Sequence, residues 1–302
     1  MSHTVTLLVW AWLMASSFIV SGLIVGYASP IATSTFRFFL ACLIMFCVLV
    51  VRWRKKGLKV SDQFKALFVC RSRVFHYVII SGALVGFFIG LFAALQSTTP
   101  LNTSVIYTLV PLIGVFIARV WLHEISPWLR ILGFVIGSCG AILVLFSTQA
   151  VGDFAWHSGD LIFIGACVLL ALHVVSVQKW GRSLEALSGA FMMMLFGCIW
   201  LLPIALFWGD LEKVQWQTSG FWFYGLYLTV FTTLFTFVLQ QRLVVAVGAS
   251  RLLAFSYTIP VWVALFVSVA NARVFSLFNW GFLAGLLCLC VALFLIDRKQ
   301  SE

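Results

Sequence analysis

The chain is 302 residues long, and 63% of its residues are hydrophobic whereas only 9% are charged. Soluble domains carry about 25% charged residues, so this composition excludes a soluble globular protein and indicates an integral membrane protein. The formal net charge of +10 would suit a nucleic-acid partner, but the positions of the basic residues argue against one.

Apolar runs of roughly 20 residues recur along the chain, and each is long enough to cross a hydrocarbon core of ~30 Å as a helix. The first run starts almost at Met1 with no basic residue before it, so we interpret it as a retained span and not as a signal peptide. The sequence therefore predicts an all-α polytopic membrane protein with ten transmembrane helices. They are expected near residues 4–25, 31–51, 74–95, 101–121, 129–146, 158–178, 188–208, 221–239, 248–270 and 276–296.

Basic residues gather on one side of this predicted bundle. That side holds sixteen of the 19 Lys and Arg residues: Arg52, Arg54, Lys55, Lys56, Lys59, Lys65, Arg71, Arg73, Arg119, Arg130, Lys179, Arg182, Arg242, Arg251, Arg298 and Lys299. The opposite side holds only Lys213 and Arg273. Since positive residues stay in the cytoplasm, we predict a multi-pass inner-membrane protein with both termini cytoplasmic, and no nucleic-acid partner.

Two segments about 149 residues apart look alike: "NTSVIYTLVPLIGVFIARVWLHE" from Asn102 and "RLLAFSYTIPVWVALFVSVANAR" from Arg251. Pro111 of the first aligns with Pro260 of the second. After the loss of one loop residue, the following GxxxG pairs also align: Gly133 and Gly137, Gly281 and Gly285. Each repeat holds five spans, and because five is odd the second repeat enters the membrane in the opposite sense. Inverted repeats of this kind build many secondary transporters.

These features resemble the EamA-type permeases of the drug/metabolite transporter (DMT) superfamily. The resemblance rests on "ASSFIV" in the first span, "FRFFLA" around Arg37, "LNTSVIYTLVPLIGVFIARVWLHE" ending in Glu124, and the GxxxG pairs. It covers nearly the whole chain. It implies two EamA-like five-helix repeats, at residues 1–150 and 151–302, and a transporter of metabolites such as amino acids, or of drugs. Arg273 stands where a second-half counterpart of Glu124 is expected.

One charge lies within an otherwise apolar span. Arg37 follows Pro30 by seven residues, roughly 10 Å below the membrane edge at 1.5 Å per residue. Thr33, Ser34 and Ala41 share its helical face, which favours a substrate-binding arginine in a cavity, since intramembrane charges usually mark substrate paths. The alternative is an arginine that snorkels to the outer headgroups. Without substrate, we expect water and hydroxyls such as that of Tyr107 to satisfy the guanidinium.

The fourth and ninth spans each carry a proline behind polar residues, which predicts two kinked helices that line a pore. We expect substrate contacts from Asn102, Thr103, Tyr107, Thr108, Ser256 and Tyr257, and kinks at Pro111 and Pro260. The alternative is ordinary packing of kinked helices. Trp10, Trp12 and Tyr27 can also face a ligand, and the sequence does not sort them.

His173 lies inside the sixth span, and no Asp or Glu falls in mid-membrane. We therefore predict that transport is either uncoupled or coupled to protons through His173. The alternative is a hydrogen-bonded histidine of the bundle. At the end of the fourth span, Glu124 lies near Arg119 and Arg130 in the sequence, which predicts an interfacial salt bridge.

Enzyme signatures are sparse, and we expect no catalytic residues, no metal site and no cofactor. The predicted function is secondary transport, as a permease or exporter, of a small organic metabolite such as an amino acid or a related anionic or zwitterionic compound, by alternating access between the two inverted halves. The alternative is a membrane scaffold or regulatory subunit that transports nothing. The expected partners are a small-molecule substrate and the lipid bilayer, with the chain as a monomer or homodimer.

Reporter fusions test the topology. A reporter joined after Arg73 or after Glu302 should give a cytoplasmic signal, because sixteen of the 19 basic residues lie on that side. A periplasmic signal from either fusion would contradict the count of ten spans.

Overall fold

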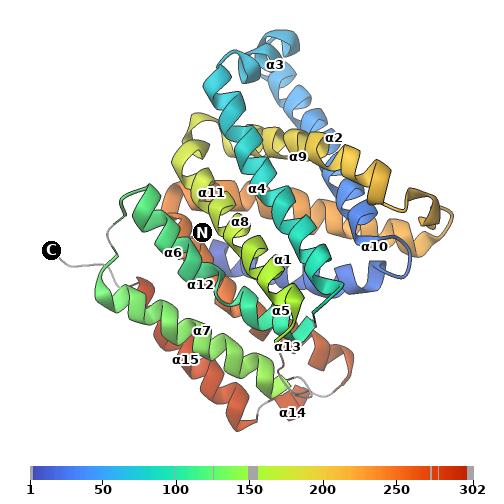
Figure 1. Cartoon of the computed structure of the whole chain (residues 1–302). Helices are drawn as coiled ribbons and strands as arrows, with labels where there is room; N and C mark the ends of the chain where they lie inside the picture. The colour runs from blue at the N-terminus through green and yellow to red at the C-terminus, as the bar shows by residue number, and fades with distance from the viewer. Residues whose placement is uncertain are drawn as a thin grey trace.

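The computed structural model describes residues 3–98, 100–124, 126–148, 156–272, 274–277 and 279–297, and over these residues the secondary structure is helical (Figure 1). Eight helical segments among them are long and apolar enough to cross a membrane. Two shorter apolar segments, Val105–Trp121 and Trp280–Ile296, bring the number of described spans to ten. The predicted all-α fold of ten transmembrane helices is confirmed.

The helices of the first half are α1 (His3–Ile24), α2 (Pro30–Lys55), α3 (Val60–Phe68), α4 (Arg71–Leu95), α5 (Pro100–Tyr107), α6 (Val110–Trp121) and α7 (Trp128–Thr148). Those of the second half are α8 (Ser158–Trp180), η1 (Gly181–Ser183), α9 (Ala186–Trp208), η2 (Leu211–Lys213), α10 (Ser219–Thr229), η3 (Val230–Phe235), α11 (Thr236–Val247), α12 (Ala249–Phe255), η4 (Ser256–Thr258), α13 (Ile259–Ala270), α14 (Val274–Leu277) and α15 (Trp280–Asp297). We call the end of the bundle that holds His3 and α3 the basic end.

The structure differs from the predicted spans in two places. The long polar loop after the second span contains a helix, α3, which the sequence analysis did not predict. The eighth span continues to Val247, so that Gly248 alone joins α11 to α12, with a φ of +88° that favours glycine. Arg242, which lay between two predicted spans, therefore lies on α11, whereas Arg251 lies on α12, within the predicted ninth span. Arg273, Arg298 and Lys299 lie outside the described residues.

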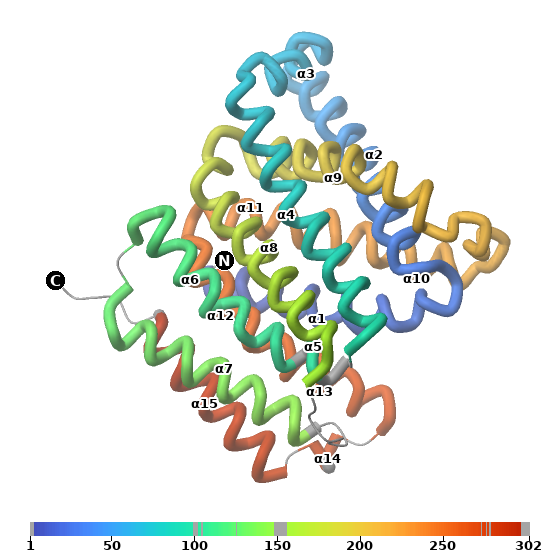
Figure 2. The backbone as a smooth tube through the Cα atoms, in the orientation of Figure 1, coloured from blue at the N-terminus to red at the C-terminus, as the bar shows by residue number. Residues whose placement is uncertain are grey.

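Helices of one half pack against their counterparts in the other. α7 packs along α15, α2 packs on α9, and α6 packs on α12. Other contacts between the halves occur in equivalent pairs. For example, α1, the first span of its half, packs on α13 of the ninth span, and α8, the first span of the second half, packs on α6 of the fourth span. Figure 2 shows α7 and α15 running side by side, with α3 at the far end of the molecule between α2 and α4. This exchange is what two inverted five-helix repeats produce.

The fourth and ninth spans break just before their prolines. α5 ends at Tyr107, two turn residues follow, and Pro111 lies in the first turn of α6. In the second half, the 3₁₀ segment η4 separates α12 from α13, whose first turn contains Pro260. A proline lacks the N–H that would bond to the carbonyl four residues back, so the preceding turn opens in both repeats.

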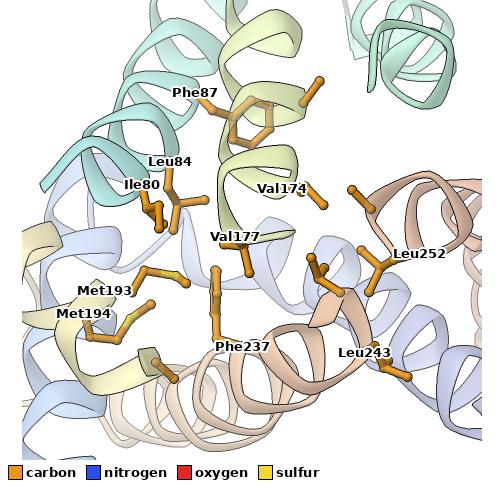
Figure 3. Close-up of a cluster of buried hydrophobic side chains, with 14 of the residues drawn as sticks. Ile80, Leu84, Phe87, Val174, Val177, Met193, Met194, Phe237, Leu243 and Leu252 are labelled. Carbon is orange, nitrogen blue, oxygen red and sulfur yellow. The ribbon is translucent and has the colours of Figure 1, made fainter. Parts of the chain in front are cut away.

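Apolar side chains fill the space between α4, α8, α9 and α11. Figure 3 shows Ile80, Leu84, Val177, Met193 and Phe237 turned toward one another from these helices. All five are 8% exposed or less. Large apolar residues elsewhere, such as those on the outer faces of α9 and α15, are exposed and so cover the surface that faces lipid. This cluster joins α4 of the first half to three helices of the second.

Glycines allow α7 and α15 to approach closely. A Cβ at Gly140 would lie 3.0 Å from the carbonyl oxygen of Gly285, and a Cβ at Gly285 would lie 2.9 Å from that of Gly140. Not every glycine of the predicted GxxxG pairs lies at this crossing. A Cβ at Gly137 would meet the ring of Tyr257 at 2.6 Å and not the backbone of α15. Helices in lipid associate through van der Waals packing, and small residues allow the close approach that this requires. The glycines therefore stabilise the contact between α7 and α15.

Substitution of Gly285 tests that contact. Gly285→Ala should lower the thermal stability of the detergent-solubilised chain by about 1 to 3 kcal/mol, because the new methyl group meets backbone atoms of α7 that cannot move aside. Gly165→Ala is the matched control, since a Cβ there has no heavy atom within 4 Å. Equal melting curves for both variants would contradict the described crossing.

Candidate functional site

Arg37 lies inside the helix bundle and not at its surface. The start of α2 is fixed by Ser29, whose side chain accepts a hydrogen bond from the N–H of Ala32 at 3.1 Å. Arg37 comes two turns later, and the residue is only 9% exposed. An arginine that snorkels would extend its guanidinium to the headgroups and remain exposed. The burial of Arg37 therefore favours a position inside the bundle over snorkelling.

Two threonines of the eighth span hold the guanidinium. Its Nε donates to Thr233 Oγ1 at 3.0 Å and its Nη2 donates to Thr232 Oγ1 at 3.2 Å. Both threonines lie in η3, a π-helical segment in which backbone bonds join residues five apart. Their hydroxyls donate to the carbonyl of Leu228 at 2.8 and 3.0 Å, which leaves oxygen lone pairs to accept from Arg37.

These contacts replace the partner that the sequence analysis expected. Tyr107 was expected to help satisfy Arg37, but its ring packs edge-on against Phe18, with centroids 6.1 Å apart. The signal for the true partners is the run "TTLFT" at residues 232–236, where hydroxyls interrupt an apolar span. Nothing in that run identifies Arg37 as their partner.

The described contacts leave the charge of Arg37 without a counterion. A guanidinium has five N–H donors, and the two bonds to threonine use only part of this capacity. Ion pairs among the described residues lie elsewhere: Arg52–Glu185, Arg130–Glu124 and Lys213–Asp210. A buried cation is costly without an opposite charge. Arg37 is therefore suited to bind an anionic group.

The other predicted residues of α2 lie on the same face. Thr33 and Ser34 are buried, and Thr33 Oγ1 has no hydrogen-bond partner among the described residues. On the opposite face, Phe39 is 64% exposed and Leu43 is 50% exposed. The helix thus turns a polar stripe inward and an apolar surface toward lipid.

The structure sorts the aromatic residues that the sequence left open. Trp10 is 3% exposed, and its Nε1 has no hydrogen-bond partner among the described residues. The same holds for the buried Nε1 of Trp262 on α13, a residue that the sequence analysis missed. Trp12 is 40% exposed and packs against Phe266, while Tyr27 packs against Tyr224 near the chain turn after α1. Buried donors without partners are rare, so the two indoles are candidate ligand contacts.

Asn102 belongs to a network that joins the two halves at the end opposite the basic end. It donates to Asp160 Oδ2 at 2.7 Å, and the N–H of His157 donates to the same oxygen at 2.8 Å. The Thr98 hydroxyl donates to the other carboxylate oxygen. The network caps the first turn of α8, so its evident role is structural.

Among the remaining predicted residues of the fourth and ninth spans, Thr108 and Ser256 bond to their own preceding turns. Thr103 is buried, the Thr108 hydroxyl donates to the carbonyl of Val105 at 2.6 Å, and Ser256 donates to that of Leu253 at 2.6 Å. Hydroxyls that bond to the preceding turn stabilise an irregular helix. These contacts fit the breaks before the prolines.

Tyr257 points toward α7. Its hydroxyl donates to the carbonyl of Phe134 at 2.9 Å and lies 2.9 Å from Ser138 Oγ. The Ser138 hydroxyl also donates to the carbonyl of Thr108 at 3.0 Å, in the open turn before Pro111. The described bonds of Tyr257 thus support both helix breaks and do not run to Arg37.

His173 is fully buried, and both of its ring nitrogens have partners. Nδ1 lies 2.9 Å from the carbonyl oxygen of Ile80, and Nε2 lies 3.1 Å from Nε2 of Gln240. A carbonyl only accepts, so Nδ1 carries the proton and Nε2 of the neutral ring accepts from the amide. The geometry agrees with the alternative of a hydrogen-bonded bundle histidine.

At the basic end, Arg130 Nη1 lies 3.3 Å from Glu124 Oε1, which confirms the predicted interfacial salt bridge. Gln178 of α8 extends this contact, since its Nε2 donates to Glu124 Oε2 at 3.5 Å and its Oε1 accepts from the N–H of Ala249 at 2.5 Å. The start of α12 is thereby tied to the end of the fourth span.

Two pockets lie at the basic end. One has a volume of about 210 Å³ beside Gln241 and Arg242, and the other a volume of about 270 Å³ beside α3. Neither is lined by Arg37 or by another residue predicted to bind substrate.

Comparison with known proteins identifies relatives over most of the chain. It is 25% identical over 258 residues to the uncharacterized transporter YyaM of Bacillus subtilis, which covers 84% of this chain and 81% of that protein. It is 24% identical over 298 residues to the uncharacterized transporter YetK of the same organism, covering 96% and 86%. It is also 24% identical over 207 residues to an S-adenosylmethionine/S-adenosylhomocysteine transporter of Chlamydia trachomatis, covering 65% and 59%.

The fold has a solved counterpart as well. A protein crystal structure superimposes on 98% of this chain and 97% of its own, with a TM-score of 0.77. The sequence identity of 16% limits this likeness to the fold. The model of the EamA-like transporter family matches residues 2–146 and 157–298. These matches cover both halves, and the chain belongs to the EamA-like transporter family.

Proposed function

We propose that this transporter carries a small anionic or zwitterionic organic metabolite, and that Arg37 binds the carboxylate or phosphate of that substrate. The observation that carries the proposal is a buried guanidinium whose described hydrogen bonds go only to neutral hydroxyls. Carboxylates and phosphates match the planar fork of arginine and supply the missing charge. The membrane orientation proposed with it places both termini in the cytoplasm, on the strength of the distribution of basic residues.

The η3 segment supports this role because it fixes the guanidinium before substrate arrives. The Thr232 and Thr233 hydroxyls hold Nε and one Nη2 hydrogen, and the other donors have no partner among the described residues. A donor group held in place loses little conformational freedom when a ligand binds. Thr33 Oγ1 and the indole N–H of Trp10, which have no hydrogen-bond partner among the described residues, are further groups of the first half that we assign to substrate.

One relative narrows the proposed substrate class. The chlamydial protein is named for S-adenosylmethionine and S-adenosylhomocysteine. Both compounds carry an amino-acid carboxylate, and both carry an aromatic base that can stack on indole. We propose an amino acid or an amino-acid derivative as the substrate of this chain, moved by alternating access of the two halves.

Arg37 variants test the proposal in transport assays with anionic and zwitterionic metabolites. Arg37→Ala should reduce transport at least about 100-fold, because two charge-assisted hydrogen bonds are lost, each worth about 1.5 to 3 kcal/mol. Arg37→Lys should also impair transport, since an ammonium cannot reproduce the bidentate contact. Protein level in the membrane should stay normal. Normal transport by Arg37→Ala would overturn the assignment.

Threonine variants test whether Thr232 and Thr233 position the Arg37 guanidinium or only stabilise the eighth span. Thr232→Val with Thr233→Val keeps the side-chain shape but removes the acceptors for Arg37, so transport should fall about tenfold or more. Thr229→Val is the matched control, because this buried hydroxyl of the same span bonds only to the carbonyl of Gly225 at 2.8 Å in the described contacts. Equal effects of both changes would mean that the threonines merely stabilise the helix.

We also propose that any proton coupling runs through His173. Protonation would add an N–H at Nε2, facing the Gln240 amide N–H, so the amide would have to turn over and the contact of α8 with α11 would change. His173→Ala should then abolish acceleration of transport by a pH gradient, whereas Gln240→Leu should leave a titrating ring in place. A pH-gradient effect that survives in His173→Ala would exclude this route.

A further inference from the structure

A pocket of about 270 Å³ at the basic end lies outside the proposed transport site. Its walls come from the end of α2, from α3, from the start of α4, and from the connection between α8 and α9. The polar side chains that matter for its chemistry are Arg52, Lys56, Arg73, Ser183, Glu185 and Ser188. Elements of both halves therefore line this open pocket.

The end of α2 is built so that the chain folds back over this pocket. Gly57 has a φ of +70°, its N–H donates to the carbonyl of Arg54, and the N–H of Leu58 donates to the carbonyl of Trp53 at 3.0 Å. This pair of bonds is a Schellman motif, in which the residue after the glycine packs against the last helical turn. Trp53 and Leu58 accordingly both line the pocket.

Hydrogen bonds between its walls hold the pocket in shape. Arg73 Nη1 donates to the carbonyl of Ala66 at 3.0 Å and so ties α4 to α3. Arg52 bonds both carboxylate oxygens of Glu185, at 2.9 and 3.2 Å, and so ties α2 to the start of α9. Such paired contacts fix the geometry of a guanidinium.

The charges in the pocket are unbalanced. Glu185, the acidic residue among those that line it, is already paired with Arg52, whereas Lys56 and Arg73 add two further positive charges. The Nε of Arg73 is buried and has no hydrogen-bond partner among the described residues. The Ser183 and Ser188 hydroxyls supply neutral donors beside them. Several N–H and O–H donors around a net positive charge suit the oxygens of a phosphate group.

The position of the pocket relative to the membrane indicates whether the phosphate belongs to a lipid or to a soluble compound. Trp53 lines it, and Trp121 and Trp180 pack together at the same end of the bundle, as expected of residues at a membrane interface. Leu58, at 40% exposure, gives the pocket an apolar edge. We propose that this pocket binds the phosphate of an anionic phospholipid headgroup, a lipid site separate from the proposed substrate site.

Reconstitution in nanodiscs tests this lipid site. The full-length chain is placed in phosphatidylcholine discs with rising fractions of phosphatidylglycerol, and its melting temperature and bound lipid, counted by native mass spectrometry, are recorded. A second arm adds inorganic phosphate to discs of phosphatidylcholine alone. We expect phosphatidylglycerol to raise the melting temperature and inorganic phosphate at millimolar concentration to have no such effect.

Matched variants identify the residues responsible. Lys56→Gln with Arg73→Gln should weaken phosphatidylglycerol binding ~25-fold, since each basic side chain that contacts the headgroup phosphate would contribute about a fivefold effect. Lys55→Gln with Arg71→Gln removes the same number of charges from the same two helices, but neither residue lines the pocket. This control should bind as the unaltered chain does. Lys56→Gln alone, at an exposed helix end, should weaken binding about fivefold without disturbing α3.

Three outcomes would overturn the proposal. Equal stabilisation by both lipids would show that the pocket does not select a negative headgroup. Equal losses in the pocket and control variants would assign the effect to the general charge of the surface. Stabilisation by inorganic phosphate that pocket variants abolish would assign the site to a soluble phosphate compound instead of a lipid.

Discussion

The burial of one positive charge constrains the arrangement of the helices around it. A guanidinium stays protonated, and estimates for desolvating it in a membrane range from about 3 to above 10 kcal/mol. The chain offsets part of this cost with acceptors 195 and 196 residues away, Thr232 and Thr233. Their hydroxyls are correctly oriented because η3 places both beside the carbonyl of Leu228. Arg37 and η3 therefore depend on each other, since loss of either leaves buried polar groups unsatisfied.

The two inverted repeats contain equivalent helix contacts, but only the first repeat places a charged residue in this one. The two-fold relation that pairs α2 with α9 also pairs the span containing η3 with α4. Yet α9 carries no charged residue between Ala186 and Trp208, and its contact with α4 is the apolar cluster of Figure 3, with one hydrogen bond from Ser81 to the carbonyl of Met193 at 2.9 Å. One of two equivalent contacts thus holds a charge, and the other is a close-packed core. Since packed cores resist deformation, the polar contact is the better place for a binding site.

The sequence predicted the helical spans and the inverted repeat, and it marked Arg37 as a charge within a span, because hydrophobic run length and a lone charge are local signals. Partners of buried groups were less accessible. Thr232 and Thr233 are far from Arg37 in the chain, and no periodicity marks the π-helical turn that aligns them. Tyr257 was expected in a pore, but it bonds to Phe134, because the space left by Gly137 accepts its ring. Such choices depend on how two helices cross, and a single sequence does not contain that geometry.

The long helix α8 connects the polar contacts at the two ends of the bundle. Near its start, Asp160 binds Asn102 of the first half, and near its end Gln178 binds Glu124 of the first half and the N–H of Ala249. His173 lies between them, bonded to Ile80 and Gln240. Alternating access requires that contacts between halves open at one end while those at the other end persist. Because a continuous helix transmits rotation along its length, movement of α8 that loosens Asp160 from Asn102 also bears on Gln178 and on the start of α12. In the alternating access proposed for this chain, the contacts of α8 would therefore join opening at one end to closure at the other.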